Sequence, residues 1–279
     1  MTITPSIKKG YLEKLAGEGK RADGRSFDDY RKIEIETGIV SKAEGSARVK
    51  IGNTQVVAGI KIDVGEPYPD SPDSGVMTTA AELIPLASPD FESGPPRTNA
   101  IELARVVDRG IRESGVIEVD KLCIEPGEKI WIVFIDIHII DFDGNLFDAA
   151  SLASLAALMT SIIPIERLKP TLEKLQEKFP SVKNILNEHP TDYPLPLKTP
   201  PISCTSVKYN KSIVIDPALD EEEIAEARLT VATDENGDIR AMQKGLKGSF
   251  SVDEIKKVIK ASIDNGKKIR EQLYKSIGK

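Results

Sequence analysis

Residues 92–115 read ESGPPRTNAIELARVVDRGIRESG, and this stretch predicts a proline-bounded loop followed by an amphipathic helix. Asn99 is expected to cap the helix, with Glu102 three residues later completing a capping-box pattern. The face expected to be buried carries an apolar residue every four positions: Leu103, Val107 and Ile111. The pattern therefore predicts a helix that packs on a core by one face.

Another face of the same helix carries Arg105, Arg109 and Arg112 at the spacing i, i+4, i+7. Each planar guanidinium can bind phosphate oxygens through two hydrogen bonds, so such a row can hold several phosphates. The alternative is an ordinary solvated surface, because Glu102 and Asp108 precede Arg105 and Arg112 at ion-pair spacing. From the helix alone, the solvated surface is the better interpretation.

The composition limits the classes of function. The chain has 279 residues, enough for one large or two modest domains, and its 40% hydrophobic content can form a real core. A net charge of −6 and a pI near 5.3 argue against broad coating of nucleic acid but permit a narrow channel lined by a few arginines. With 5% aromatic residues, a large platform for base stacking is not expected.

Neither a cofactor nor a metal site is expected. The sequence has no GxxxxGK[ST] or GxGxxG loop, and His138 and His189 belong to no zinc motif. Cys123 and Cys204 have no paired spacing, which favours a reducing cytosol over a disulfide framework. No apolar signal segment or membrane-length apolar run occurs, so we expect a cytoplasmic protein without a membrane partner.

The order of elements predicts an α+β fold with two similar strand-and-helix halves. Residues 1–20 form an N-terminal helical extension, and residues 21–163 form the first half, with a hairpin turn at Gly52-Asn53 and a deeply buried helix near its end. Residues 164–198 form a charged connector with its own helix. Residues 199–279 form the second half and end in a C-terminal helix.

An ordered set of motifs resembles the RNase PH family. The motifs are RADGR at 21–25, GSARVKIGNTQVVAGIK at 45–61, ELARVVDRGIRES at 102–114, DGNLFDAASLASLAAL at 143–158, and an acidic stretch at 216–223 followed by ARLTVATDENGDI. The N-terminal helix, the GPP-x-x-NAIELARVVDR block and the long connector most resemble one subfamily. The members of that subfamily are the non-catalytic RNase PH-like subunits of the archaeal exosome ring.

The resemblance implies an RNase PH-like fold, whose halves are of the ribosomal protein S5 domain 2-like type. It also implies a hetero-hexameric ring, a trimer of heterodimers, in which such subunits alternate with a catalytic RNase PH-like subunit. By the same resemblance, single-stranded RNA is expected to enter the central channel and to be shortened from its 3′ end by phosphate, which would release nucleoside diphosphates. RNA-binding cap proteins of the exosome are implied as further partners.

Two departures from the family's catalytic pattern decide which subunit the chain resembles. Phe147 stands where catalytic members carry a phosphate-holding arginine, and Asp148 beside it adds a negative charge, although it is also expected as a helix N-cap. Arg228 replaces an aspartate of the catalytic site, which leaves Glu222 without its partner. The acidic run 220–223 is then interpreted as a solvated helix start.

The family's helix equivalent to 98–114 faces the active site formed with the neighbouring subunit. The resemblance therefore makes Arg105 and Arg109 expected contacts to RNA phosphates, with Arg112 as a third candidate whose Asp108 partner competes. The RADGR arginines, Arg21 and Arg25, are interpreted as parts of a structural turn.

Three hypotheses about function follow. The favoured one is a catalytically silent ring subunit, with no catalytic residues of its own, that supports 3′-to-5′ phosphorolysis by its neighbour and contributes RNA-binding arginines. The alternative is a phosphate-dependent 3′-to-5′ exoribonuclease that is active in its own right. The third is a purely structural ring element without RNA contact. A ring subunit should bury a large apolar surface against its partner and should associate with itself when alone.

Overall fold

A hairpin in which buried and half-buried residues largely alternate forms the middle of the first sheet. The computed structural model describes residues 5–278, so residues 1–4 of the predicted extension and residue 279 lie outside the described residues. In the hairpin, β2 (Gly45–Ile51) and β3 (Thr54–Gly65) pair in antiparallel register across the expected turn. Gly52 in that turn has φ of 59°, a conformation that glycine adopts without strain. The predicted hairpin is confirmed.

The first sheet has the strand order β1-β2-β3-β6-β4, with β5 paired to β6. The long strand β6 pairs with β3 in antiparallel and with β4 in parallel orientation. The other bounds are β1 Ile33–Thr37, β4 Val76–Leu83, β5 Cys123–Glu125 and β6 Lys129–Asp141, with a short 3-10 helix η1 at Val119–Leu122.

The second sheet has four strands in the order β10-β9-β11-β12. Its bounds are β9 Ile202–Tyr209, β10 Ser212–Ile215, β11 Ala227–Thr233 and β12 Ile239–Gly245, with α6 at Leu219–Ile224 and α7 at Val252–Ser276. Helix α7 packs against β9 and β11 and is capped by Ser251, whose side chain accepts a hydrogen bond from the Glu254 backbone N–H.

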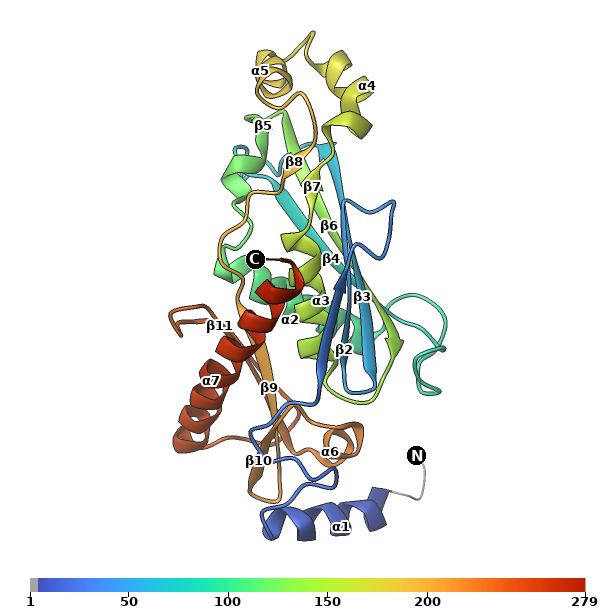
Figure 1. Ribbon diagram of the computed structural model, residues 1–279, viewed down its shortest axis with the longest axis vertical. Helices are drawn as coiled ribbons and strands as arrows, with labels where there is room; N and C mark the ends of the chain where they lie inside the picture. Colours follow the sequence, from blue (N-terminus) through green and yellow to red (C-terminus); the bar gives the residue numbers. More distant parts are fainter. Residues whose placement is uncertain (1–4, 279) are drawn as a thin grey trace.

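Helix α3 (Leu146–Met159) lies between the two sheets and joins them (Figure 1). It contacts β2 and β3 of the first sheet, β9 of the second sheet and helix α2. Small residues let these neighbours approach closely, and almost every residue of the helix is buried. The prediction of a deeply buried helix is confirmed.

Helix α2 (Thr98–Ser114) packs on β4, α3 and β12, with its predicted apolar face buried. The expected cap is wrong, because the helix begins one residue before Asn99 and its N-cap is Arg97, which makes no side-chain cap hydrogen bond. Glu102 does not reach back to the helix start, because its carboxylate is paired with Arg228 from β11.

The connector contains two helices, α4 (Ile165–Leu175) and α5 (Pro180–Glu188), where the sequence predicted one. Pro180 starts the second helix at its first position, where its missing N–H costs nothing. The short strands β7 (Ile162–Ile163) and β8 (Tyr193–Pro194) pair where the connector leaves and rejoins the rest of the chain (Figure 1). At the opposite end of the molecule, the predicted N-terminal helix α1 (Pro5–Gly17) contacts α6.

A buried carboxylate ties distant segments together. Asp216 follows β10 and is completely buried, and it accepts hydrogen bonds from Arg31 Nε at 2.9 Å and Nη2 at 2.8 Å. Arg25 Nη1 and Asn145 Nδ2 donate to the same carboxylate, each at 2.8 Å. Burial alone would raise the pKa of Asp216, but the hydrogen bonds and charge of Arg31 hold it below its ordinary value.

We expect Asp216→Asn to lower the free energy of unfolding by about 3–5 kcal/mol, because it leaves Arg31 and Arg25 without their buried counter-charge. Denaturant unfolding at neutral pH measures this loss. The stability that the Asp216 carboxylate contributes is present above its unfolded pKa of about 3.9 and is lost as the pH falls through its lower folded pKa. Wild type and Asp216→Asn should therefore become equally stable in strong acid. Asp70→Asn, at an exposed position, is the control; equal stability of the two variants at neutral pH would contradict the prediction.

Candidate functional site

The turn before α3 stands where the family resemblance places a phosphate-holding loop. Gly144 has φ of 87° and Asn145 has φ of 56°, so both adopt the left-handed conformation. The backbone N–H of Asn145 donates to Glu222 Oε1 at 2.9 Å. Its side-chain amide donates to Asp148 and Asp216, each at 2.8 Å. Carboxylates of the chain itself therefore take the donors that Asn145 offers in this turn.

The two predicted departures, Phe147 and Arg228, lie in contact with each other. The guanidinium carbon of Arg228 lies 4.0 Å from the centre of the Phe147 ring, which is a cation–π arrangement. Arg228 also forms an ion pair with Glu102 from α2, and its side chain is only 13% exposed. The aromatic ring and the arginine fill this space together, and Glu102 neutralises the arginine.

A hollow of about 160 Å³ remains beside this contact. Six of its ten lining residues are apolar, and three carry ionisable side chains. The lining residues are Leu83, Phe91, Asn99, Glu102, Leu103, Phe142, Leu146, Phe147, Glu222 and Arg228. Burial raises the pKa of Glu222 to about 7. With two carboxyl groups against one guanidinium, the hollow does not favour an anion such as phosphate.

Asp148 is not the helix cap that the sequence predicted. The N-cap of α3 is Asn145, and Asp148 is buried inside the first turn. It accepts hydrogen bonds from the Tyr30 hydroxyl at 2.7 Å and from the Thr205 backbone N–H at 2.9 Å, while burial raises its pKa to about 6. Asp148 therefore connects α3 to β9 and to the N-terminal segment, and does not face the hollow.

The prediction of a solvated acidic run at 220–223 is wrong for Glu222, which lines the hollow beside Arg228 and accepts the Asn145 N–H, and for Glu221. This carboxylate is buried and pairs with Arg21, whose Nε lies 2.9 Å from Oε1 and whose Nη2 lies 2.5 Å from Oε2. Asp220 does lie at the surface, where it pairs with Lys8 at 2.8 Å. Arg21 is buried, and Arg25 is bound to Asp216, which supports the interpretation of the RADGR turn as structural.

The arginine row on α2 faces solvent, as its spacing predicted. Arg112 donates to both oxygens of Asp108, at 3.0 and 2.9 Å, and to the carbonyl of Met77 on β4 at 3.1 Å. The Glu102–Arg105 pair allowed by spacing does not form, because Glu102 is paired with Arg228. Arg109 donates through Nη1 to Gln243 Oε1 at 2.7 Å.

The arginines of residues 5–278 differ in whether a carboxylate neutralises them. Nine of them lie within ion-pair distance of a carboxylate: Arg21, Arg25, Arg31, Arg48, Arg97, Arg112, Arg167, Arg228 and Arg240. Of the other three, Arg270 is buried, while Arg105 and Arg109 are exposed. Within this part of the chain, Arg105 and Arg109 are thus the exposed arginines whose charge no carboxylate takes up. They border a hollow of about 290 Å³ on α2 and β4.

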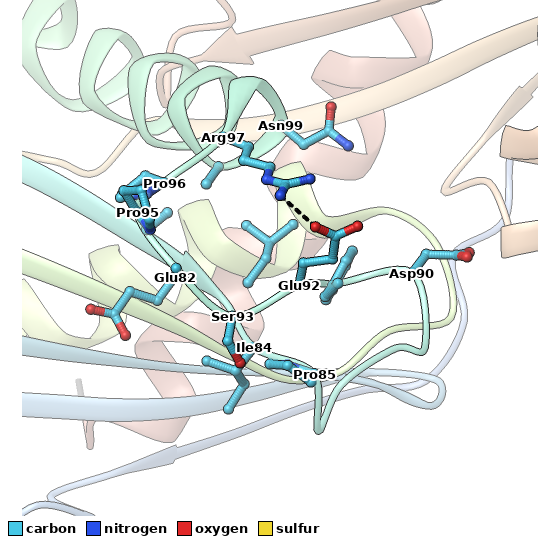
Figure 2. Close-up of a pocket in the computed structure, with 15 residues that line it drawn as sticks. Glu82, Ile84, Pro85, Asp90, Glu92, Ser93, Pro95, Pro96, Arg97 and Asn99 are labelled. Atoms are coloured by element: carbon cyan, nitrogen blue, oxygen red, sulfur yellow. Dashed lines mark ion pairs between the residues drawn. The ribbon is translucent and has the colours of Figure 1, made fainter.

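A further hollow, of about 310 Å³, lies between the end of β4 and the loop that precedes α2 (Figure 2). Glu82, Asp90 and Glu92 line it, and Arg97, its basic residue, is paired with Glu92. Its charge is therefore negative, which disfavours contact with RNA phosphates. The arginine row is the better surface for such contacts.

Sequence reasoning missed three residues of this region, namely Gln243, Tyr30 and Thr205. Their partners lie far away along the chain, so no spacing signal could have identified them. Residues 5–278 contain no group of three His, Cys, Asp or Glu side chains placed to hold a metal ion. None of the helices in the same range has the length and apolar character needed to cross a membrane.

Comparison with known proteins matches both halves of the chain. The model of the 3′ exoribonuclease family, domain 1, matches residues 29–164, and that of domain 2 matches residues 199–265. The exosome complex component Rrp42 of Methanocella arvoryzae is 51% identical over 271 residues, which cover 97% of this chain and 97% of that protein. Its counterpart in Thermococcus gammatolerans is 51% identical over 276 residues, covering 99% and 97%.

A solved structure described as the Archaeoglobus fulgidus exosome with RNA bound to the active site contains a similar chain. That chain is 45% identical, with a TM-score of 0.87, and the match covers 97% of this chain and 99% of that chain. The similarity therefore extends over the connector and both sheets, and includes the region of the candidate site.

We expect wild-type protein to lose stability relative to Glu222→Gln as the pH rises from about 5 to about 8. Folding raises the pKa of Glu222 to about 7. The stability that its protonated carboxyl contributes is therefore fully present below the unfolded pKa and is lost as the pH rises through the folded pKa. The difference in unfolding free energy should change by up to about 1.4 kcal/mol per pH unit below the folded pKa.

Denaturant unfolding at several pH values measures this difference. Glu226→Gln, at a neighbouring exposed position, should follow the wild-type curve. Parallel curves for wild type and Glu222→Gln would show that the Glu222 carboxyl does not gain a proton on folding.

Proposed function

The chain belongs to the 3′ exoribonuclease (RNase PH) family, and we propose that it is the non-catalytic ring subunit of an archaeal RNA exosome. In this role it supports 3′-to-5′ phosphorolysis of RNA by the neighbouring catalytic RNase PH-like subunit. The partners would be that subunit, in a trimer of heterodimers, single-stranded RNA and the RNA-binding cap proteins, in the cytoplasm. The curated exosome relatives and the exosome structure, with which the chain shares nearly its full length, support this assignment.

The observation that carries the silent role is the contact between Phe147 and Arg228. Phosphorolysis requires inorganic phosphate to be bound beside the RNA, through preorganised positive donors. Here the Arg228 guanidinium is stacked on Phe147 and neutralised by Glu102, while Glu222 accepts the Asn145 N–H. An attacking phosphate would have to displace these internal partners, so the alternative of an independently active enzyme is disfavoured.

We assign the RNA contact to Arg105 and Arg109. Both are exposed and neither is neutralised by a carboxylate within residues 5–278, so each can bind a phosphate without first breaking an ion pair. Arg112 differs, because its guanidinium holds Asp108 and the Met77 carbonyl. We therefore give Arg112 the role of fixing α2 against β4 and only a minor share in RNA binding.

A degradation assay on 3′-labelled single-stranded RNA tests the silent role. The purified chain is expected to be inactive with or without inorganic phosphate, because its own site does not hold phosphate. After co-expression with the catalytic RNase PH-like protein of its source, activity should appear and should require phosphate. Phosphate-dependent degradation by the chain alone would establish the alternative, an exoribonuclease in its own right.

A second assay tests the arginine assignment in the assembled complex. Arg105→Gln combined with Arg109→Gln should slow degradation by about a hundredfold or more, because each of the two lost charge-assisted hydrogen bonds costs about 1.5–3 kcal/mol. Arg112→Gln should change thermal stability more than degradation. Size measurements must show intact assembly of every variant; unchanged degradation by the Arg105/Arg109 variant would favour a purely structural ring element.

A further inference from the structure

We propose that Gln243 on β12 is a positioning residue for RNA binding, because it holds the Arg109 guanidinium in place without neutralising its charge. This inference rests on the proposed function, since it takes Arg109 as an RNA contact. The decisive observation is the hydrogen bond of 2.7 Å from Arg109 Nη1 to Gln243 Oε1. It joins the arginine helix of the first half to the edge strand of the second sheet.

The amide of Gln243 can hold Arg109 in only one orientation. A guanidinium has donors and no acceptor, so it must face the amide oxygen. The amide nitrogen donates to the Lys244 carbonyl at 3.3 Å, which turns the oxygen towards α2. Both ends of the amide therefore have partners, and the acceptor is oriented before RNA binds.

The strand that carries Gln243 is anchored in the buried network. Gln243 lies directly opposite Thr230 on β11, and residues in such a pair share one face of the sheet. The Thr230 hydroxyl lies 2.9 Å from that of Thr205, which donates to Asp148 at 2.7 Å. The acceptor for Arg109 thus lies on a strand that is paired with a member of the buried network.

Comparison with Arg112 explains why the partner is a neutral amide. Asp108 fixes Arg112 through two hydrogen bonds but also cancels its charge. Gln243 fixes Arg109 through one hydrogen bond and leaves the positive charge available. Holding a flexible side chain in advance lowers the ordering cost of binding, and a neutral partner does so without weakening the attraction to phosphate.

The salt dependence of RNA binding separates positioning from charge. The logarithm of the binding constant falls with the logarithm of salt concentration by about 0.7 for each phosphate neutralised on a single strand. Loss of a positioning residue weakens binding without changing this slope, whereas loss of a phosphate contact changes both. Gln243→Leu removes the acceptor at similar size, and Gln243→Glu replaces it with a carboxylate that neutralises Arg109.

The experiment measures fluorescence anisotropy of a labelled single-stranded RNA with the assembled complex. Inorganic phosphate is left out, and a series of salt concentrations is used. Gln243→Leu should weaken binding by about three- to tenfold with an unchanged slope, the effect expected from one hydrogen bond. Gln243→Glu and Arg109→Gln should weaken it further and reduce the slope by about 0.7. Gln272→Leu, an exposed glutamine on α7, should bind as wild type.

A double variant excludes a merely structural effect. Gln243→Leu should cause no additional loss in the Arg109→Gln background, because its effect acts through that arginine. A further loss there, or wild-type binding by Gln243→Leu when Arg109→Gln binds weakly, would overturn the positioning role. Wild-type binding by Arg109→Gln would instead overturn the RNA contact itself, and with it this inference.

Discussion

The buried Asp216 carboxylate is the interaction on which the candidate site depends. It lies between the two sheets and accepts hydrogen bonds from the N-terminal segment, through Arg25 and Arg31, and from Asn145 at the start of α3. Removing a carboxylate from water is costly, and here several charged or polar donors compensate for the cost. Because Asn145 is held in a left-handed conformation by this network, the position of Phe147 two residues later also depends on it.

The same network explains why the donors in the turn before α3, which could bind an anion, are bound to carboxylates of the chain itself. Glu222 accepts the Asn145 N–H, and Glu102 neutralises the arginine that lies on the Phe147 ring. The two carboxyl groups belong to different elements, α6 and α2, and each supplies an acceptor oxygen to a donor that a bound anion could otherwise use. The result is a packed centre at the junction of the two halves in which the Asn145 N–H and the Arg228 guanidinium already have internal partners.

Local periodicity was sufficient to predict most elements: the hairpin at 52–53, the buried helix α3 and the apolar face of α2 agree with the structure. The order of motifs correctly placed the chain in its family, while the division of the chain at residues 163 and 198 stays a prediction. The failures at Glu102, Asp148 and Glu221 have one cause. Each prediction used a neighbour in sequence, but the real partner was distant, as with Glu102 and Arg228, which are 126 positions apart. Such pairs depend on how the sheets meet, which spacing does not reveal.

The positions of the carboxylates determine which arginines keep a free charge. On a chain with net charge −6, carboxylates outnumber basic groups and neutralise most arginines of residues 5–278, so an exposed arginine without a carboxylate partner is exceptional there. Glu102, three residues before Arg105, is paired with Arg228 and does not reach that arginine. Arg109 instead donates to the neutral amide oxygen of Gln243. Arg228 therefore acts in two places. It stacks on Phe147, the contact on which the proposed silent role rests, and it holds the Glu102 carboxylate away from Arg105, which leaves that arginine available for the proposed contact with RNA phosphates.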